Sequence, residues 1–130
     1  MTYLLTFLQS NFIEIPFYCV AHALIERRPE NFKWIRLARS ACTTTFANLI
    51  THPIVFFGFL GSGSTTGLTW LQGILAAEIF AVVAEAFLHR ASFSRAFTTR
   101  QWLIVTCGAV IANLASWELG PWLSYYTFLR

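Results

Sequence analysis

The stretch Leu75-Ala-Ala-Glu78-Ile-Phe-Ala-Val-Val-Ala-Glu85-Ala-Phe-Leu-His89 decides the fold, because it lies in an apolar run long enough to cross a bilayer and yet carries two carboxylates. Positions i and i+7 fall on one face of a helix, about 10 Å apart along its axis. A carboxylate in hydrocarbon is costly, so such residues face a protein interior or a wet cavity and mark functional sites. The stretch therefore predicts a membrane-spanning helix whose neighbours cover Glu78 and Glu85.

Composition indicates that the whole chain is a membrane protein. It has 130 residues, of which 56% are hydrophobic and 12% are charged, and its mean hydropathy is +0.57. Soluble domains are about 25% charged. The net charge of +3 does not indicate a nucleic-acid partner, because eight of the nine Lys and Arg residues fall in two short connecting segments. We expect the lipid bilayer to surround the chain and no nucleic acid to bind it.

Four apolar segments are each long enough for one crossing, which takes about 20 residues. They predict an integral membrane, all-α fold: a compact four-helix transmembrane bundle that forms a single domain over residues 1–130, with no soluble domain. The predicted helices are residues 3–25, 37–60, 68–88 and 102–125. Pro53 in the second segment lacks a backbone donor, so we expect a local kink there.

The distribution of positive charge predicts the orientation of these helices. Five cations lie between the first two segments and three between the last two, whereas the N-terminus and the connection at residues 61–67 carry none. Lys and Arg are in excess on the cytoplasmic side of membrane proteins. Both basic loops are therefore predicted to be cytoplasmic and both termini outside, in the inner (plasma) membrane if the source is bacterial.

The two halves of the chain resemble each other, which suggests two tandem helical hairpins. The pattern Cys-x4-Ala-Asn-Leu-x-Thr/Ser occurs around Asn48 and again around Asn113, and a Glu-Ile pair occurs at Glu14 and at Glu78. Such an arrangement would be a parallel repeat, related by an axis along the membrane normal. The alternative is chance matching between apolar segments of low diversity.

Four polar side chains fall at about the same depth when the midpoint of each segment is placed at the bilayer centre. They are Glu14, Asn48, Glu78 and Asn113, with His52 one turn from Asn48. Because such groups need partners in lipid, we expect them to bond one another. Two interpretations remain open: a structural network that fixes helix register, with one or both glutamates protonated, and a site that handles protons or cations.

Two further pairs close the first and third segments at the predicted cytoplasmic edge. His22-x3-Glu26 and Glu85-x3-His89 each place two side chains on one helix face. Imidazole and carboxylate suit Zn²⁺ or Fe²⁺, so these four residues are candidate ligands of a divalent metal, and the two histidines are candidate axial ligands of haem. Interfacial ion pairs with nearby arginines are the alternative. Glu85 also belongs to the predicted proton or cation site.

Other reactive residue types give weaker signals. Cys19, Cys42 and Cys107 lie in apolar runs without CxxC spacing, which favours buried small hydrophobes over disulfides or zinc ligands. Ser116 and His52 lack the context of a nucleophile elbow, so the sequence favours a protein that is not an enzyme.

Three functions are compatible with these patterns. The leading one is a small polytopic membrane protein that handles protons or cations through buried carboxylates, as an oligomer. The second is a non-catalytic accessory or structural subunit that docks onto a larger membrane complex by its helix faces. The third is an intramembrane metal- or cofactor-binding protein. The expected protein partners are further copies of this chain or other membrane subunits.

Overall fold

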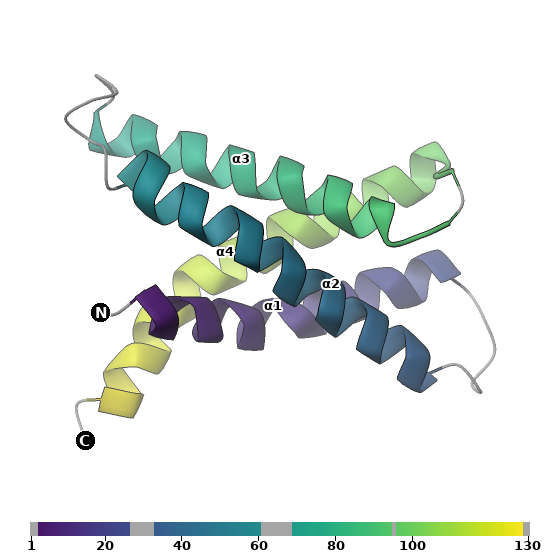
Figure 1. Ribbon diagram of the computed structural model, residues 1–130, viewed down its shortest axis with the longest axis horizontal. Helices are drawn as coiled ribbons and strands as arrows, with labels where there is room; N and C mark the ends of the chain where they lie inside the picture. The colour runs from purple at the N-terminus through teal and green to yellow at the C-terminus, as the bar shows by residue number, and fades with distance from the viewer. Residues whose placement is uncertain (1–2, 27–32, 61–68, 95, 129–130) are drawn as a thin grey trace.

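The computed structural model describes residues 3–26, 33–60, 69–94 and 96–128, and within these ranges all regular secondary structure is helical. Its long helices are α1 (Tyr3–Glu26), α2 (Lys33–Pro53), α3 (Trp70–Ala91) and α4 (Thr99–Phe128), and a π-helical segment, η2 (Ile54–Leu60), continues α2. They form an elongated bundle (Figure 1). The prediction of an all-α fold is confirmed.

Three of these helices are long and apolar enough to cross a membrane: α1, the segment Leu71–Ala91 of α3 and the segment Thr99–Gly120 of α4. The predicted second span differs from the others. Its helix begins at Lys33, four residues earlier than predicted, so charged residues occupy its first turns. Its apolar end is divided after Pro53, where the α-helix gives way to η2.

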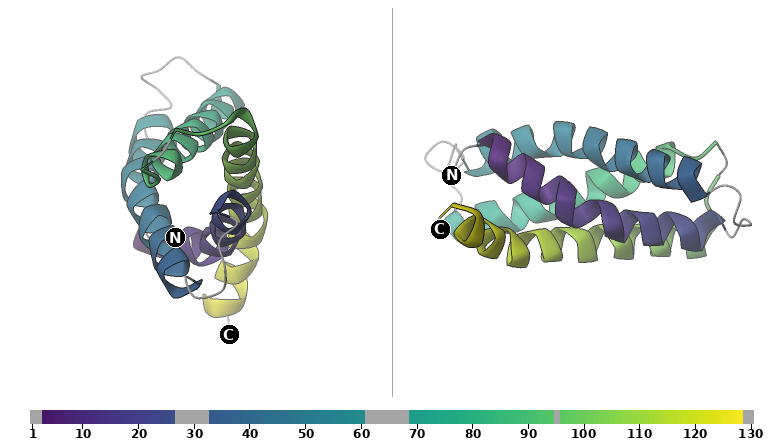
Figure 2. Two further views of the ribbon diagram at one scale, coloured as in Figure 1. Left: turned by 90° about the vertical axis from the view of Figure 1, so that its right-hand side faces the viewer. Right: turned by 90° about the horizontal axis from the view of Figure 1, so that it is seen from below.

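The connections of the chain alternate between the two ends of the bundle. The end of α1, the start of α2, the end of α3 and the start of α4 lie together, and we call this the basic end because Arg36, Arg39, Arg90 and Arg100 belong to these helix ends (Figures 1 and 2). Both termini lie at the opposite end. The helices therefore alternate in direction along the chain.

The helices surround a shared interior, because α1 packs against α2 and α4 while α3 packs against the same two helices. The α1–α4 contact is close. Ala109 and Ala112 of α4 are fully buried, and a Cβ added at Gly108 would lie 3.1 Å from the Cβ of Ala21. The small residues at 108 and 112 thus let α4 approach α1, as expected of a small-x3-small spacing.

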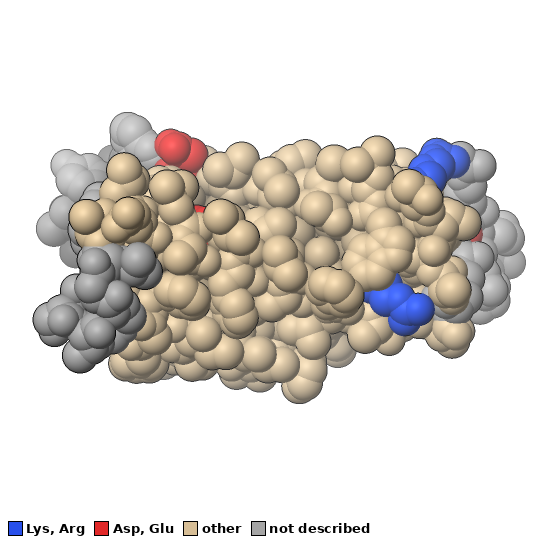
Figure 3. Space-filling model, turned by 90° about the horizontal axis from the view of Figure 1, so that it is seen from above, with Lys and Arg blue, Asp and Glu red and all other residues tan. Residues whose placement is uncertain are grey.

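The outer surface of the bundle is apolar, whereas much of the interior is polar. Large hydrophobic side chains face outward on every helix, including Phe12 (76% exposed), Ile79 (65%) and Leu103 (64%). On the face in Figure 3, Lys and Arg atoms lie toward one end and the middle band shows no charged atoms. This distribution suits a bundle surrounded by lipid.

The cysteines correct one prediction from the sequence. All three are free thiols, but Cys42 and Cys107 are exposed on the outer surface and Cys19 is half-buried. The outer surface of this bundle is itself apolar. A cysteine within an apolar run of the sequence can therefore lie on that surface and need not be buried among the helices.

Candidate functional site

Glu85 is the centre of the buried polar interior. Its carboxylate is 2% exposed and accepts hydrogen bonds from the other three long helices. The hydroxyl of Tyr18 (α1) and the amide Nδ2 of Asn113 (α4) each donate to Oε2 at 2.7 Å. The hydroxyl of Thr51 (α2) shares its hydrogen between Oε1 at 3.4 Å and the carbonyl of Ala47 at 3.1 Å. One carboxylate of α3 thus links all four helices.

A second buried carboxylate joins the first hairpin. Glu14 of α1 is 2% exposed, and its Oε2 accepts a 2.9 Å hydrogen bond from Nδ2 of the fully buried Asn48 on α2. Glu14 is also near enough to Glu85 for the two carboxylates to interact electrostatically. Each hairpin therefore contains one glutamate–asparagine bond, and the two glutamates share the same interior.

Two histidines form a contact between Glu85 and the basic end. Nε2 of His22 (α1) lies 2.9 Å from Nδ1 of His89 (α3), and both side chains are fully buried. The ring of Tyr18 stacks on His89 with centroids 3.6 Å apart and planes 8° apart. Because the hydroxyl of the same tyrosine donates to Glu85, Tyr18 contacts both the carboxylate and the imidazole pair.

Helix geometry explains why α1 supplies residues to both groups. Glu14, Tyr18 and His22 follow one another at intervals of four residues, so they lie on one face of α1 about 6 Å apart along its axis. Glu85 and His89 have the same spacing on α3. Two facing helices with matching intervals therefore bring carboxylate to phenol and imidazole to imidazole.

Smaller polar groups extend the interior along α2 and α4. The hydroxyl of Thr44 donates to the carbonyl of Ser40, which is the bonding within the helix that short hydroxyl residues favour in apolar surroundings. Further toward the termini, the hydroxyls of Ser116 and Ser10 are 2.9 Å apart and join α4 to α1. The polar interior thus runs from near the basic end past the middle of the bundle.

The structure brings together four of the six residues predicted for the proton or cation site. Glu14 and Asn48 are bonded to each other, as are Glu85 and Asn113. Asn113 was expected beside Glu78, but its partner is the glutamate two turns further along α3. Glu78 itself is half-buried and has no hydrogen bond to any described residue.

His52, the last of the six, is half-buried and packs edge-on against Phe7, with ring centroids 5.9 Å apart. It makes no hydrogen bond within the described part of the chain. The residue follows Thr51 at the end of α2, so its side chain points to a different side of the helix from the hydroxyl that reaches Glu85.

The four candidate metal ligands are not gathered at one point. His22 and His89 meet, but Glu85 is bonded to Tyr18 and Asn113, and Glu26 forms ion pairs with Arg39 and, at 3.6 Å, with Arg36 of α2. Among the described residues, no group of three or more His, Cys, Asp or Glu side chains is placed to hold a metal ion.

Several buried polar atoms of the interior have no hydrogen-bond partner among the described groups. They are Nδ1 of His22, Nε2 of His89, Oδ1 of Asn48, Oδ1 of Asn11 and Oγ of Ser40. Buried polar groups in proteins are nearly always bonded to protein or to ordered water. These atoms are therefore exceptions within the polar interior, because each keeps an unused hydrogen-bonding position.

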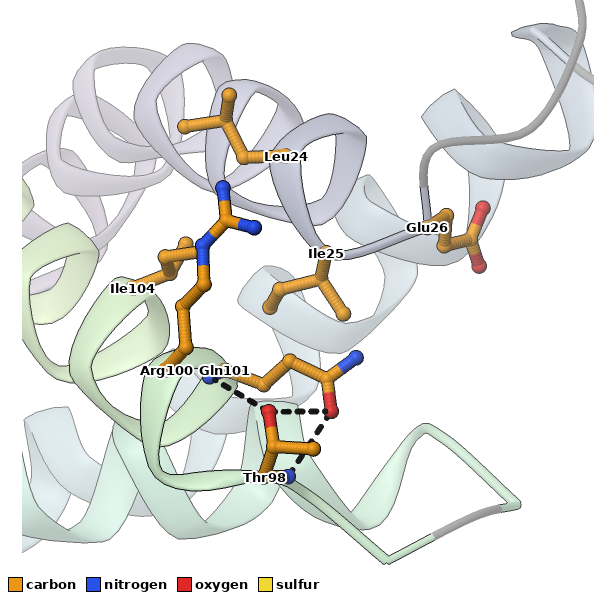
Figure 4. Close-up of a pocket in the computed structure, with 7 residues that line it drawn as sticks. All are labelled: Leu24, Ile25, Glu26, Thr98, Arg100, Gln101 and Ile104. Atoms are coloured by element: carbon orange, nitrogen blue, oxygen red, sulfur yellow. Dashed lines mark hydrogen bonds between the residues drawn. The ribbon is translucent and has the colours of Figure 1, made fainter.

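A pocket at the basic end is separate from this interior. It lies between the end of α1 and the start of α4, with Leu24, Ile25 and Ile104 as its apolar part and Arg100 beside them (Figure 4). Thr98 and Gln101 of this pocket form a reciprocal cap at the start of α4. The backbone N–H of Gln101 donates to the Thr98 hydroxyl, and the backbone N–H of Thr98 donates to the side-chain oxygen Oε1 of Gln101. None of the residues that bond Glu14, Glu85 or the two histidines lines this pocket.

Tyr18 and Thr51 are site residues that the sequence analysis did not single out. The signal for Tyr18 was its place in Glu14-x3-Tyr18-x3-His22, a polar stripe on an otherwise apolar helix. Thr51 lies three residues after Asn48 and so on the same face of α2. Both residues are found by following the polar side chains along one face of a helix. Comparing only the residues at the midpoint of each segment misses them.

Comparisons with protein-family models, with curated proteins and with solved structures find no match for this chain. Function is therefore inferred from the geometry of the polar groups buried around Glu85 and Glu14.

Proposed function

We propose that this chain is a small polytopic membrane protein that conducts protons, with Glu85 as the central proton-binding group and Glu14 and the two buried histidines as its partners. The observation that carries the proposal is the placement of Glu85, which is buried among four helices and accepts hydrogen bonds from three of them. Ionisable residues inside membrane-spanning segments are costly and are typical of ion and proton pathways.

The hydrogen bonds to Glu85 favour a proton over a metal cation as the species that binds there. Hard cations take six or more oxygen ligands, and carboxylate and carbonyl oxygens supply them. Around Glu85 the neighbouring groups turn N–H and O–H donors toward the carboxylate, and the Asn113 amide is fixed in that orientation because Nδ2 also donates to the carbonyl of Ala109 at 2.9 Å. Such donors stabilise a carboxylate that gains and loses a proton.

The proposal includes a fourth crossing formed by α2 and η2 together. Residues 40–60 contain no Asp, Glu, Lys or Arg, and these 21 residues are long enough to span a bilayer as a continuous helical segment. The charged first turns of α2 would then lie in the headgroup region at the basic end. By the positive-inside rule this end is cytoplasmic and both termini are outside.

Proton flux into liposomes tests the function directly. The purified protein is reconstituted with an internal pH-sensitive dye, and a potassium diffusion potential of either sign is applied. We expect wild-type protein to acidify or alkalinise the lumen faster than empty liposomes do, and Glu85→Gln to remove this flux. Glu118→Gln makes the same change at an exposed carboxylate of α4 and is expected to keep wild-type flux.

A structural role is the outcome that would replace the proposal. The Glu14–Asn48 and Glu85–Asn113 bonds each join the two helices of one hairpin, which is also what a subunit needs to keep its shape in a larger complex. If correctly folded wild-type protein carries no flux at either sign of the potential, proton conduction is wrong. Stoichiometric recovery with a larger membrane complex would then identify an accessory subunit.

A further inference from the structure

The contact between His22 and His89 has a property that the proposed function does not use. One nitrogen of each ring is engaged in the 2.9 Å contact, and the other nitrogen of each ring, Nδ1 of His22 and Nε2 of His89, is buried without a hydrogen-bond partner among the described residues. Both side chains are fully buried. The pair therefore forms a short chain of four nitrogens whose two outer members are unoccupied by protein groups.

The chemistry of imidazole gives these outer nitrogens opposite roles. A neutral imidazole has one N–H donor and one acceptor nitrogen. When His22 Nε2 donates to His89 Nδ1, the outer nitrogen of His22 is an acceptor and the outer nitrogen of His89 carries a hydrogen. When the central bond is reversed, the outer roles reverse as well. In both states one end of the pair can take up a proton while the other can release one.

The surroundings hold the two rings in this alignment. Tyr18 stacks on His89, and Phe93 packs against His22 with centroids 4.8 Å apart and planes 65° apart. The charged and titratable groups near the pair are Glu85, reached through Tyr18, and Arg39, whose guanidinium lies 5.6 Å from the Phe93 ring centroid. Arg39 is ion-paired with Glu26 at the basic end and is also near enough to His22 to interact with it electrostatically.

The position of the pair places it on the route from Glu85 to the basic end. His89 is one turn beyond Glu85 on α3, and His22 is one turn before Glu26, the last residue of α1. Glu26 is half-buried and belongs to the charged end of the bundle. The imidazole pair therefore lies about one helical turn beyond Glu85 toward this end.

We propose that the His22–His89 pair is a two-ring proton relay between the Glu85 cluster and the basic end of the bundle, an inference that depends on the proposed proton conduction. In one direction a proton binds Nδ1 of His22, the hydrogen on Nε2 of His22 passes to Nδ1 of His89, and the hydrogen on Nε2 of His89 leaves. One proton enters and one leaves, no charge remains on the pair, and the central bond ends with its direction reversed. Before a second proton passes in the same direction, both rings return to their first tautomers.

The relay distinguishes proton conduction from a purely structural contact between the rings. A structural pair needs only the central hydrogen bond, which other side chains can supply. Glutamine at position 22 can place an amide N–H where Nε2 lies, and asparagine at position 89 can place a carbonyl oxygen where Nδ1 lies. Both amides preserve the bond, but neither passes a proton from one side of the group to the other.

The test compares His22→Gln and His89→Asn with wild type in the liposome flux assay, after each variant has been shown to keep its thermal unfolding midpoint. We expect flux below about a tenth of the wild-type value for each, because a positioned proton-transfer group contributes about 100-fold or more to such steps. Wild-type flux through folded His22→Gln and His89→Asn would overturn the relay. Proton conduction would stand in that case, provided that Glu85→Gln is inactive.

A spectroscopic measurement on the wild-type chain keeps the inference testable if the variants do not fold. With ¹⁵N-labelled histidine in lipid bilayers, nuclear magnetic resonance reports whether two ring nitrogens share a hydrogen and whether the rings exchange between tautomers. The relay predicts a coupling between Nε2 of His22 and Nδ1 of His89 together with tautomer exchange in both rings. Fixed tautomers, or no coupling between the rings, would overturn it.

Discussion

Glu78 and Glu85 lie seven residues apart on the same helix and have different surroundings. Glu85 is 2% exposed and accepts hydrogen bonds from Tyr18, Thr51 and Asn113, whereas Glu78 is half-buried and has no hydrogen bond to any described residue. Depth along α3 does not account for the difference, because both residues lie within its apolar segment Leu71–Ala91. The neighbouring helices do, because their donors reach Glu85 and none among the described residues reaches Glu78.

This difference indicates how a bundle of small size can keep a carboxylate in its interior. Burial of a charge is tolerated where other groups bond it, and the glutamate without a described hydrogen bond is the less buried of the two. Glu85 is therefore the expected site of function and of stability, and Glu78 is a control on the same helix.

The largest expected effect on stability is the difference between replacing Glu85 and replacing Glu78 by leucine. Glu85→Leu removes the acceptor of the Tyr18 hydroxyl and one acceptor of the Asn113 amide, and it is expected to lower the free energy of unfolding by at least about 2 kcal/mol. Glu78→Leu removes no hydrogen bond and is expected to change it by less than about 1 kcal/mol. Reversible unfolding in mixed detergent micelles measures both, and equal losses would contradict the comparison.

A second prediction concerns the close helix contact that brings donors to Glu85. Alanine is favoured over glycine inside a helix by about 1 kcal/mol. A Cβ at Gly120 meets nothing within 4 Å beyond its chain neighbours, but Pro121 follows in the sequence and a proline crowds the preceding Cβ on helical backbone, so Gly120→Ala is expected to stabilise the protein by less than that amount. At Gly108 the Cβ would meet Ala21 at 3.1 Å, so Gly108→Ala is expected to be the less stable of the two by about 1–2 kcal/mol.

Proton flux through the same two variants extends this prediction to function. Separation of α1 from α4 moves Tyr18 and Asn113 away from Glu85, so Gly108→Ala is expected to conduct more slowly than Gly120→Ala. If both glycine variants gain stability equally, the α1–α4 contact does not control the surroundings of the carboxylate.

The smallest expected effect separates the donors of Glu85 from one another. Tyr18→Phe keeps the ring that stacks on His89 but removes a 2.7 Å hydrogen bond, and it is expected to cost about 1 kcal/mol of unfolding free energy. Thr51→Val removes a longer bond of 3.4 Å and is expected to cost less. Thermal unfolding of the two variants checks the order, and a larger loss for Thr51→Val would show that the shorter bond is not the stronger anchor.

The fold could be predicted from the sequence to the extent that apolar runs determine helices. The ends of α1, α3 and α4 lie within about three residues of the predicted bounds. The start of α2 was predicted less well, because Trp34–Arg39 carries charge and the apolar run begins only at Leu37. The π-helical turn after Pro53 had no signal beyond the proline itself.

The site could be predicted in its residue types but not in its pairing. Depth at segment midpoints placed Glu14 beside Asn48, and these residues are bonded. The same rule placed Glu78 beside Asn113, although the partner of Asn113 is Glu85, about 10 Å along the helix. The relative axial offset of two helices depends on their packing, for example at Gly108, and a single sequence does not determine it.

The most direct test of this account is the proton flux through Glu85→Gln and Glu78→Gln, measured side by side in liposomes with equal amounts of folded protein. Both substitutions replace a carboxylate by an amide of the same shape on the same helix. Loss of flux in Glu85→Gln with retention in Glu78→Gln is the predicted result. Retention of flux in Glu85→Gln, or its loss only in Glu78→Gln, would contradict Glu85 as the central proton-binding group.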